Sequence, residues 1–235
     1  ASMEVDYVRV YKNADGYDTE NIEVPVAEKD TEAFESYVCD AEGNFLADKN
    51  FDTVNTGAIT DGNVNPDSRD WYFLVGNYGG AATISKKKVD DKTYAAVNVT
   101  AGGSQNYAVQ LLQHFPLAEN YSYEISFDAY ASKERDITVK AAGDGDNSWA
   151  AYSNAFTANL TTQPAHYSYR FTMGAKSDPT ARLEFNMGLD TGTVYIANVK
   201  VTQTEIVVDN DGAKAPLENG NHVYNGSFTL GNDRL

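Results

Sequence analysis

Acidic side chains are the most numerous groups in this sequence that could do chemistry, with 34 Asp and Glu residues among 235. A retaining glycosidase needs two carboxylates on opposite sides of the bond that it cleaves, and a Glu-x-Asp-x-x-Glu spacing on a strand can supply them. The nearest match begins at Glu4 and Asp6, but Arg9 stands where the final acid is needed. With so many acids, close pairs also arise by chance, so this pair does not indicate catalysis.

The histidines and the known catalytic motifs lead to the same result. The three histidines, His114, His166 and His222, lie in separate segments without Cys or His at the spacing of a zinc site. The sequence contains no Gly-x-Ser-x-Gly, Gly-x-x-x-x-Gly-Lys-Ser/Thr or His-Glu-x-x-His motif. Residues 144–148 resemble the start of an EF-hand loop, but Trp149 occupies the sixth position, which requires glycine. We therefore predict a polar hairpin tip there and no catalysis by this chain itself.

Aromatic and amide side chains offer a different chemistry, the recognition of neutral sugars. The chain has 16 Tyr, 10 Phe and 2 Trp. Flat rings stack against the CH-rich face of a pyranose, and amides and carboxylates hydrogen-bond its hydroxyls in a partly desolvated groove. The candidates of both types are Trp71, Phe73, Tyr107, Gln110, Trp149, Glu184 and Asn186. Two alternatives stay open, because Trp71 could equally be a core residue, and Glu184 and Asn186 could form an ordinary solvated face.

The elements that must position these side chains are strands. Residues 121–129 alternate between apolar and polar side chains, as do 167–173 and 183–188, which is the period of a half-buried strand. Further strands are predicted at 71–76, 81–87, 93–100, 105–114, 136–142, 151–158 and 193–203. A short helix is predicted near Thr31–Tyr37, and the apolar phase slips between Ile196 and Val199, which predicts a bulge. About ten strands separated by turn residues favour an all-β fold, a jelly-roll β-sandwich of two antiparallel sheets.

Composition excludes several classes of partner. The formal net charge of −16 argues against nucleic acid and anionic membrane surfaces, which bind stripes of Lys and Arg. Cys39 is the single cysteine, so no disulfide can form within the chain. No apolar run is long enough to cross a bilayer, and no signal peptide is visible. These features predict a protein whose partner is a neutral molecule.

A repeated motif suggests how the chain is organised. Residues 43–52 and 220–229 share Gly, Asn and Phe at matching positions, at a spacing typical of one whole domain. The motif predicts one complete module at 43–207, followed at 208–235 by a linker and the truncated start of a second module. Residues 12–42 are predicted to be an acidic linker, and residues 1–11 a separate strand.

Seven segments, in this order, resemble carbohydrate-binding module family 4 over roughly residues 40–205. They are Asn50–Asp52, Asp70–Phe73, Gln105–Leu111, Tyr123–Ala131, Leu160–Thr162, Ala181–Gly188 and Val194–Val199. The resemblance implies two antiparallel sheets with a ligand groove across the concave face. It also implies a ligand that is a single soluble β-glucan or xylan chain.

The family's site residues transfer to particular positions of this sequence. The resemblance implies groove aromatics at Trp71 and Tyr107, the former with Phe73 nearby in the same cluster, and hydrogen-bonding positions at Gln110 and Asn186. Glu184 lies beside Asn186 on the same predicted face, Arg135 matches a basic residue before the following strand, and Trp149 falls in a loop at the rim of the groove.

The resemblance also implies a structural calcium ion. Its ligands would be Asp52 and a backbone oxygen near Asn50, where the family usually has Glu in place of Asp52. The partner acid of the last strand is replaced here by Ala197. Backbone carbonyls can complete an oxygen shell for calcium, so we expect calcium as a possible cofactor and no catalytic cofactor.

The N-terminal strand Met3–Tyr11 resembles the closing strand of glycoside hydrolase family 16 domains of the laminarinase and lichenase type. This resemblance implies an extracellular bacterial enzyme, secreted or at the cell surface, in which tandem modules in the same polypeptide hold a catalytic domain near β-1,3-glucan or mixed-linkage glucan. Two alternatives remain: a module that binds xylan or another β-1,4 chain, and a structural sandwich spacer that binds nothing.

Overall fold

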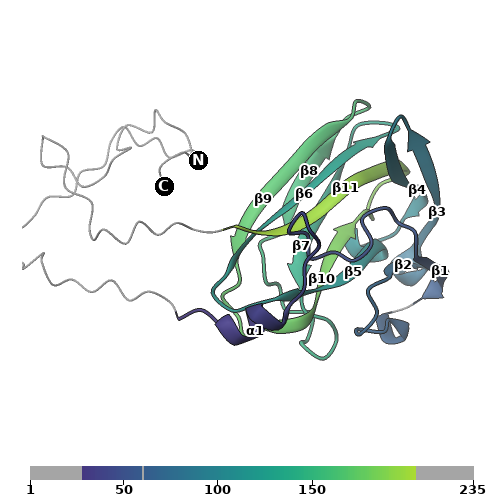
Figure 1. Cartoon of the computed structure of the whole chain (residues 1–235). Helices are drawn as coiled ribbons and strands as arrows, with labels where there is room; N and C mark the ends of the chain where they lie inside the picture. The colour runs from purple at the N-terminus through teal and green to yellow at the C-terminus, as the bar shows by residue number, and fades with distance from the viewer. Residues whose placement is uncertain (1–27, 60, 205–235) are drawn as a thin grey trace, which may run out of the picture. The chain divides into compact units, whose positions relative to one another are not determined.

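The computed structural model describes residues 28–59 and 61–204, which form one compact unit built almost entirely of strands (Figure 1). A helix α1 and three short 3-10 helices, η2 to η4, accompany eleven strands in this part of the chain. In chain order the elements are α1 (Thr31–Ser36), β1 (Val54–Ile59), η2 (Asp61–Asn63), β2 (Trp71–Val75), η3 (Asn77–Gly79), β3 (Gly80–Val89), β4 (Lys92–Gly102), η4 (Asn106–Ala108), β5 (Val109–Leu117), β6 (Ser122–Ala131), β7 (Arg135–Ala142), β8 (Phe156–Leu160), β9 (Ala165–Thr172), β10 (Asp178–Asn186) and β11 (Gly192–Thr204).

The strands form two sheets. One has six strands in the order β1-β2-β5-β10-β7-β8, and the other has five in the order β3-β4-β11-β6-β9. All pairs are antiparallel except β1 and β2, which are parallel. The predicted all-β sandwich of two sheets is confirmed, with β1 as a strand that the sequence pattern did not predict.

The core lies between the sheets and is filled by one phase of each long strand. In β6 the side chains of Tyr123, Ile125 and Phe127 are fully buried, and in β10 the same holds for Leu183 and Phe185. These are the apolar phases that the alternation predicts. Burying each such side chain stabilises the fold by roughly 1.5–3 kcal/mol. The side chains on the opposite phase of β10 point away from this core.

Helix α1 packs on this core, although it lies within the segment predicted to be a linker. Asp30 caps the helix by accepting a hydrogen bond of 2.9 Å from the backbone N–H of Ala33. Phe34 stacks on Tyr121, with ring centroids 4.6 Å apart. The predicted short helix is confirmed, and its apolar side chains extend the core.

The predicted bulge in the last strand is also confirmed. The pairing of β11 with β6 shifts register between Ala197 and Lys200, and Asn198 has a left-handed φ of 51°. One extra residue there restores the apolar phase, so that Ile196 and Val199 both face the core.

Several sequence features fall outside the described residues. The strand-like segment 3–11 and the second motif copy at 220–229 both lie there, so the domains predicted from them stay predictions. In the described part of the chain, no helix is long and apolar enough to cross a membrane.

Candidate functional site

A groove of about 570 Å³ lies on the face of the six-stranded sheet that points away from the core. Its lining comes from β5, β7 and β10, from the turns around η3 and η4, and from the connection between β7 and β8. The lining residues that carry rings, amides or charges are Tyr78, Asn106, Tyr107, Gln110, Lys140, Trp149, Arg182, Glu184 and Asn186.

Three aromatic rings line this groove and remain open to solvent. Tyr78 is 55% exposed, Tyr107 41% and Trp149 50%, which places them among the most exposed large apolar side chains of the described residues. Tyr107 and Trp149 were predicted for this role, whereas Tyr78 was not. Exposed rings beside a polar groove can bind the apolar face of a ligand.

Two short 3-10 turns position the tyrosines. Tyr78 in η3 has a left-handed φ of 53°, and its carbonyl accepts a hydrogen bond of 2.9 Å from the backbone N–H of Ser104, just before η4. Gly103 allows the two turns to approach, because a Cβ at this residue would lie 2.6 Å from both the Tyr78 carbonyl oxygen and Ala108 Cβ. The Tyr78 and Tyr107 rings therefore meet edge to face, with centroids 5.1 Å apart and planes at 90°.

Trp149 is held in the lining of the groove by a tight loop after β7. Its backbone N–H donates to the carbonyl of Asp144 at 2.8 Å, and Asp144 also accepts from the N–H of Asp146. Ser148 and Trp149 are both left-handed, with φ values of 54° and 51°. Such conformations cost about 1–3 kcal/mol each and are concentrated at functional sites, which fits a loop shaped to present the indole ring.

The floor of the groove is a buried polar chain on β5 and β10. Gln110 Nε2 donates to Asn186 Oδ1 at 2.7 Å, and Asn186 Nδ2 lies 3.4 Å from Glu184 Oε2. The Glu184 carboxylate also accepts from Arg182 Nε at 2.6 Å and lies 3.3 Å from Lys140 Nζ. Glu184 is only 1% exposed, so its buried negative charge needs compensation, and these two cations provide it.

The structure therefore brings together five of the predicted site residues: Tyr107, Gln110, Trp149, Glu184 and Asn186. The alternative in which Glu184 and Asn186 form a solvated face is wrong, because both side chains are buried. Lys140 and Arg182 were missed. Arg182 lies on the same phase of β10 as Glu184 and Asn186, and Lys140 pairs with Glu184 across β7 and β10.

Trp71 and Phe73 were predicted for the groove, and the structure places them in the core instead. Their exposed fractions are 0% and 2%, and Trp71 Nε1 donates to the backbone carbonyl of Asp48 at 2.6 Å. The reason is the phase of β2: Trp71 pairs with Gln113 and Phe73 with Leu111, which both face inward.

Arg135 is also placed away from the groove. It is 5% exposed, and its guanidinium donates to the backbone carbonyls of Met187, Asp190 and Thr191. Burial lowers the pKa of Arg135 from its ordinary value. Its role is to hold the turn between β10 and β11, which corrects the predicted role in ligand binding.

The predicted calcium ligands lie in an exposed loop. The Asp52 carboxylate is 2.8 Å from Lys86 Nζ, and Asp48 accepts hydrogen bonds from the backbone N–H groups of Asn50 and Asp52. The described residues contain no group of three or more His, Cys, Asp or Glu side chains placed to hold a metal ion. These side chains do not make a calcium shell by themselves, so calcium at Asn50 and Asp52 stays a prediction.

Comparison with known proteins explains this groove. The sequence profile of a family described as "Carbohydrate binding domain" matches residues 56–193, more than half of the chain. The chain belongs to this carbohydrate-binding domain family. The module is therefore a non-catalytic carbohydrate binder with a β-sandwich fold.

One solved structure agrees with this assignment. A structure described as "CBM4 structure and function" matches the module at 27% identity with a TM-score of 0.55, covering 68% of this chain and 99% of that one. This match confirms the resemblance to carbohydrate-binding module family 4. The second N-terminal cellulose-binding domain of Cellulomonas fimi beta-1,4-glucanase C is 21% identical, with a TM-score of 0.49 and coverage of 71% and 97%. No curated protein sequence matches the chain.

Proposed function

We propose that the module binds single β-glucan chains in the groove, with β-1,3-glucan as the leading ligand. The observation that carries this proposal is the combination of three exposed rings, Tyr78, Tyr107 and Trp149, with a buried floor of amides and charges. Sugar rings present both an apolar face and a set of hydroxyls, so a ligand of this class satisfies both parts of the lining.

The arrangement of the rings supports a polysaccharide ligand whose chain is bent. The planes of Tyr78 and Tyr107 stand at 90°, so the two rings cannot both lie flat beneath one straight ribbon. A β-1,4 chain is such a ribbon, whereas successive units of a β-1,3 chain turn relative to one another. A turning chain can place one unit on each ring face.

The floor supports a neutral ligand. Glu184 is already paired with Arg182 and Lys140, so its buried carboxylate does not need a cationic group of the ligand as a partner. The amides of Gln110 and Asn186 both donate and accept hydrogen bonds, as the hydroxyls of a sugar do.

The wider setting is part of the same proposal. The resemblance of residues 3–11 to a glycoside hydrolase family 16 strand, and the second motif copy at 220–229, suggest an extracellular enzyme with a catalytic domain and tandem modules. A binding module in such a polypeptide raises the local concentration of substrate without doing chemistry itself.

Affinity gel electrophoresis tests the proposal. The full chain is run through gels that contain laminarin, lichenan or xylan, beside a gel without polysaccharide. We expect the strongest retardation in laminarin, a weaker one in lichenan and the least in xylan. Stronger retardation in xylan would replace the proposed ligand with a β-1,4 chain. Unchanged mobility in all gels would favour the structural spacer, and release of reducing sugar by the purified chain would overturn the non-catalytic assignment.

A further inference from the structure

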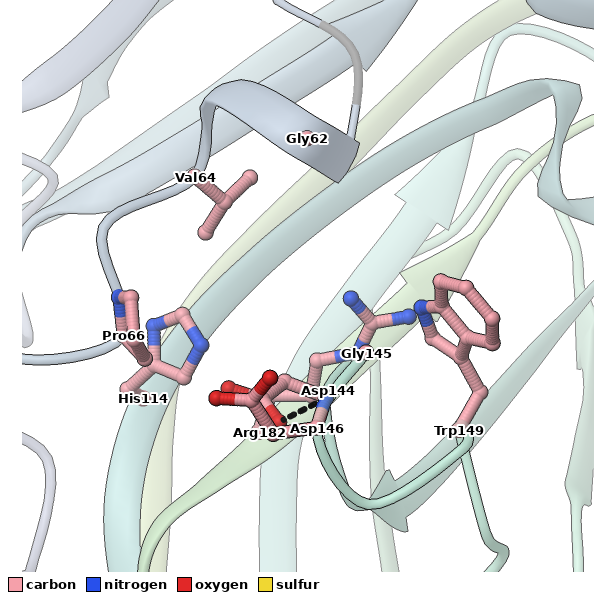
Figure 2. A pocket seen from close by; sticks show the side chains of 9 residues that line it. All are labelled: Gly62, Val64, Pro66, His114, Asp144, Gly145, Asp146, Trp149 and Arg182. Atoms are coloured by element: carbon pink, nitrogen blue, oxygen red, sulfur yellow. Dashed lines mark hydrogen bonds between the residues drawn. The ribbon is translucent and has the colours of Figure 1, made fainter.

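A second pocket of about 220 Å³ opens beside the groove, between the segment that leads into β2 and the loop after β7 (Figure 2). Val64 and Pro66 line it on one side, and Asp144 and Asp146 on another. Trp149 and Arg182 line both the pocket and the groove, so the two spaces adjoin.

His114, which lines this pocket, is an unusual residue. Its side chain is fully buried, yet within the described part of the chain neither Nδ1 nor Nε2 has a hydrogen-bond partner. Buried polar atoms in proteins are normally paired, because each unpaired group costs about 1–3 kcal/mol. Two unpaired ring nitrogens on a residue that lines a pocket therefore suggest a partner that enters from solution.

The state of the imidazole defines what that partner can be. Burial, followed by the positive charge of Arg182, lowers the pKa of His114 to about 4. The ring is therefore neutral near pH 7, with one nitrogen that donates and one that accepts. A hydroxyl group offers both functions, and the carboxylates of Asp144 and Asp146 can accept hydrogen bonds from further hydroxyls.

We propose that this pocket binds a single hexosyl branch of the glucan whose main chain lies in the groove. The pocket is much smaller than the groove, which fits one sugar unit better than a continuing chain. The shared lining at Trp149 and Arg182 lets a unit in the pocket remain attached to the main chain. This inference rests on the proposed function, since it deepens the ligand class from β-glucan to branched β-glucan.

Calorimetric titration of the full chain with two probes tests the inference. One probe is a linear β-1,3-gluco-oligosaccharide, and the other has the same main chain with one β-1,6-linked glucosyl branch. The variants are His114→Phe, which keeps a ring but removes both nitrogens, and Asp146→Ala, which changes an exposed residue and should fold normally. Asp91→Ala, in the turn between β3 and β4, is the matched control.

We expect the native chain to bind the branched probe about tenfold more tightly than the linear one, the gain of one or two hydrogen bonds. Asp146→Ala and His114→Phe should lose that preference while keeping their affinity for the linear probe, and Asp91→Ala should keep both affinities. Equal affinity of the native chain for both probes overturns the branch site but leaves the proposed function intact. If the variants bound both probes more weakly and by the same factor, the pocket would be part of the main groove. Binding of neither probe would overturn the proposed function and this inference with it.

Discussion

The rings of Tyr78 and Tyr107 meet edge to face at 90°, with centroids 5.1 Å apart. They come from turns on either side of the β3–β4 hairpin, and the contact between them forms a corner at the rim of the groove. Under the proposed function, this corner recognises a ligand by the angle between its units as well as by their surface.

Tyr107→Ala should weaken laminarin binding by about tenfold or more, because the variant removes one of the two rings of this corner. The ring is 41% exposed, so the thermal midpoint of unfolding should change little. Affinity gel electrophoresis measures laminarin binding, and scanning calorimetry measures the thermal midpoint of unfolding. Tyr195→Ala is the control, because Tyr195 stacks on Tyr130 in the five-stranded sheet, away from the groove. Equal loss of binding in both variants would contradict the role given to Tyr107.

Trp71 is expected to act on stability rather than on binding. Trp71→Ala should lower the free energy of unfolding by about 3–5 kcal/mol, since it empties a fully buried site beside Phe51 and Phe185. Trp71→Phe should cost less and lose the hydrogen bond to Asp48. Denaturant titration measures both effects. If Trp71→Phe folded with native stability but no longer bound laminarin, the ring would belong to the groove after all.

Glu184→Gln should lower the free energy of unfolding by roughly 3 kcal/mol, because it leaves the cations of Arg182 and Lys140 without their buried carboxylate. Glu124→Gln is the matched control. Glu124 pairs with Arg170 at 2.6 Å, but the arginine is 73% exposed. A surface pair of this kind contributes about 0–1 kcal/mol. Similar losses in the two variants would show that burial of Glu184 does not matter.

Stability should fall as the pH is lowered from about 6.5 towards 4, in part because of His114. Its pKa is about 4 in the folded protein against an ordinary value of 6.5. Between these values the unfolded chain binds more protons, so acid favours unfolding. Carboxylates also titrate in this range, so the comparison with His114→Phe isolates the histidine. The native chain should lose about 1–3 kcal/mol more than the variant between pH 7 and pH 4. Parallel pH profiles for the two proteins would contradict a buried neutral imidazole.

The sequence predicts best what depends on alternation alone. The apolar phases of β6 and β10, and the bulge near Asn198, follow from the period of two. The site residues Glu184 and Asn186 could be predicted because they lie on the opposite phase of a strand whose inward phase is clear, whereas Gln110 was predicted from the family resemblance.

The alternation of apolar and polar residues cannot show which side chains face inward where consecutive residues are all apolar. Residues 71–73 are three aromatics in a row, so the sequence does not say which of them face inward. Pairing with β5 decides it, because Tyr72 lies opposite Leu112 on the outer face while Trp71 and Phe73 face the core. That register is a tertiary relationship between segments far apart in the chain.

Tyr78 was missed because its position depends on a turn rather than on a strand. The signal was present as a tyrosine within a short run that contains Gly76, Gly79 and Gly80. Glycines on both sides permit the left-handed backbone that turns the ring towards Tyr107. Arg135 was misplaced for a related reason, since its carbonyl partners lie in a turn more than fifty residues later.

The most direct test of the account is a calorimetric titration of the full chain with a linear β-1,3-gluco-oligosaccharide, repeated with a β-1,4-gluco-oligosaccharide of equal length. The account predicts saturable binding of the β-1,3 ligand at about one site per chain, with weaker binding of the β-1,4 ligand and loss of both in a variant that carries Tyr78→Ala and Tyr107→Ala. Binding that survives the removal of both rings, or no binding of either ligand by the native chain, would contradict it.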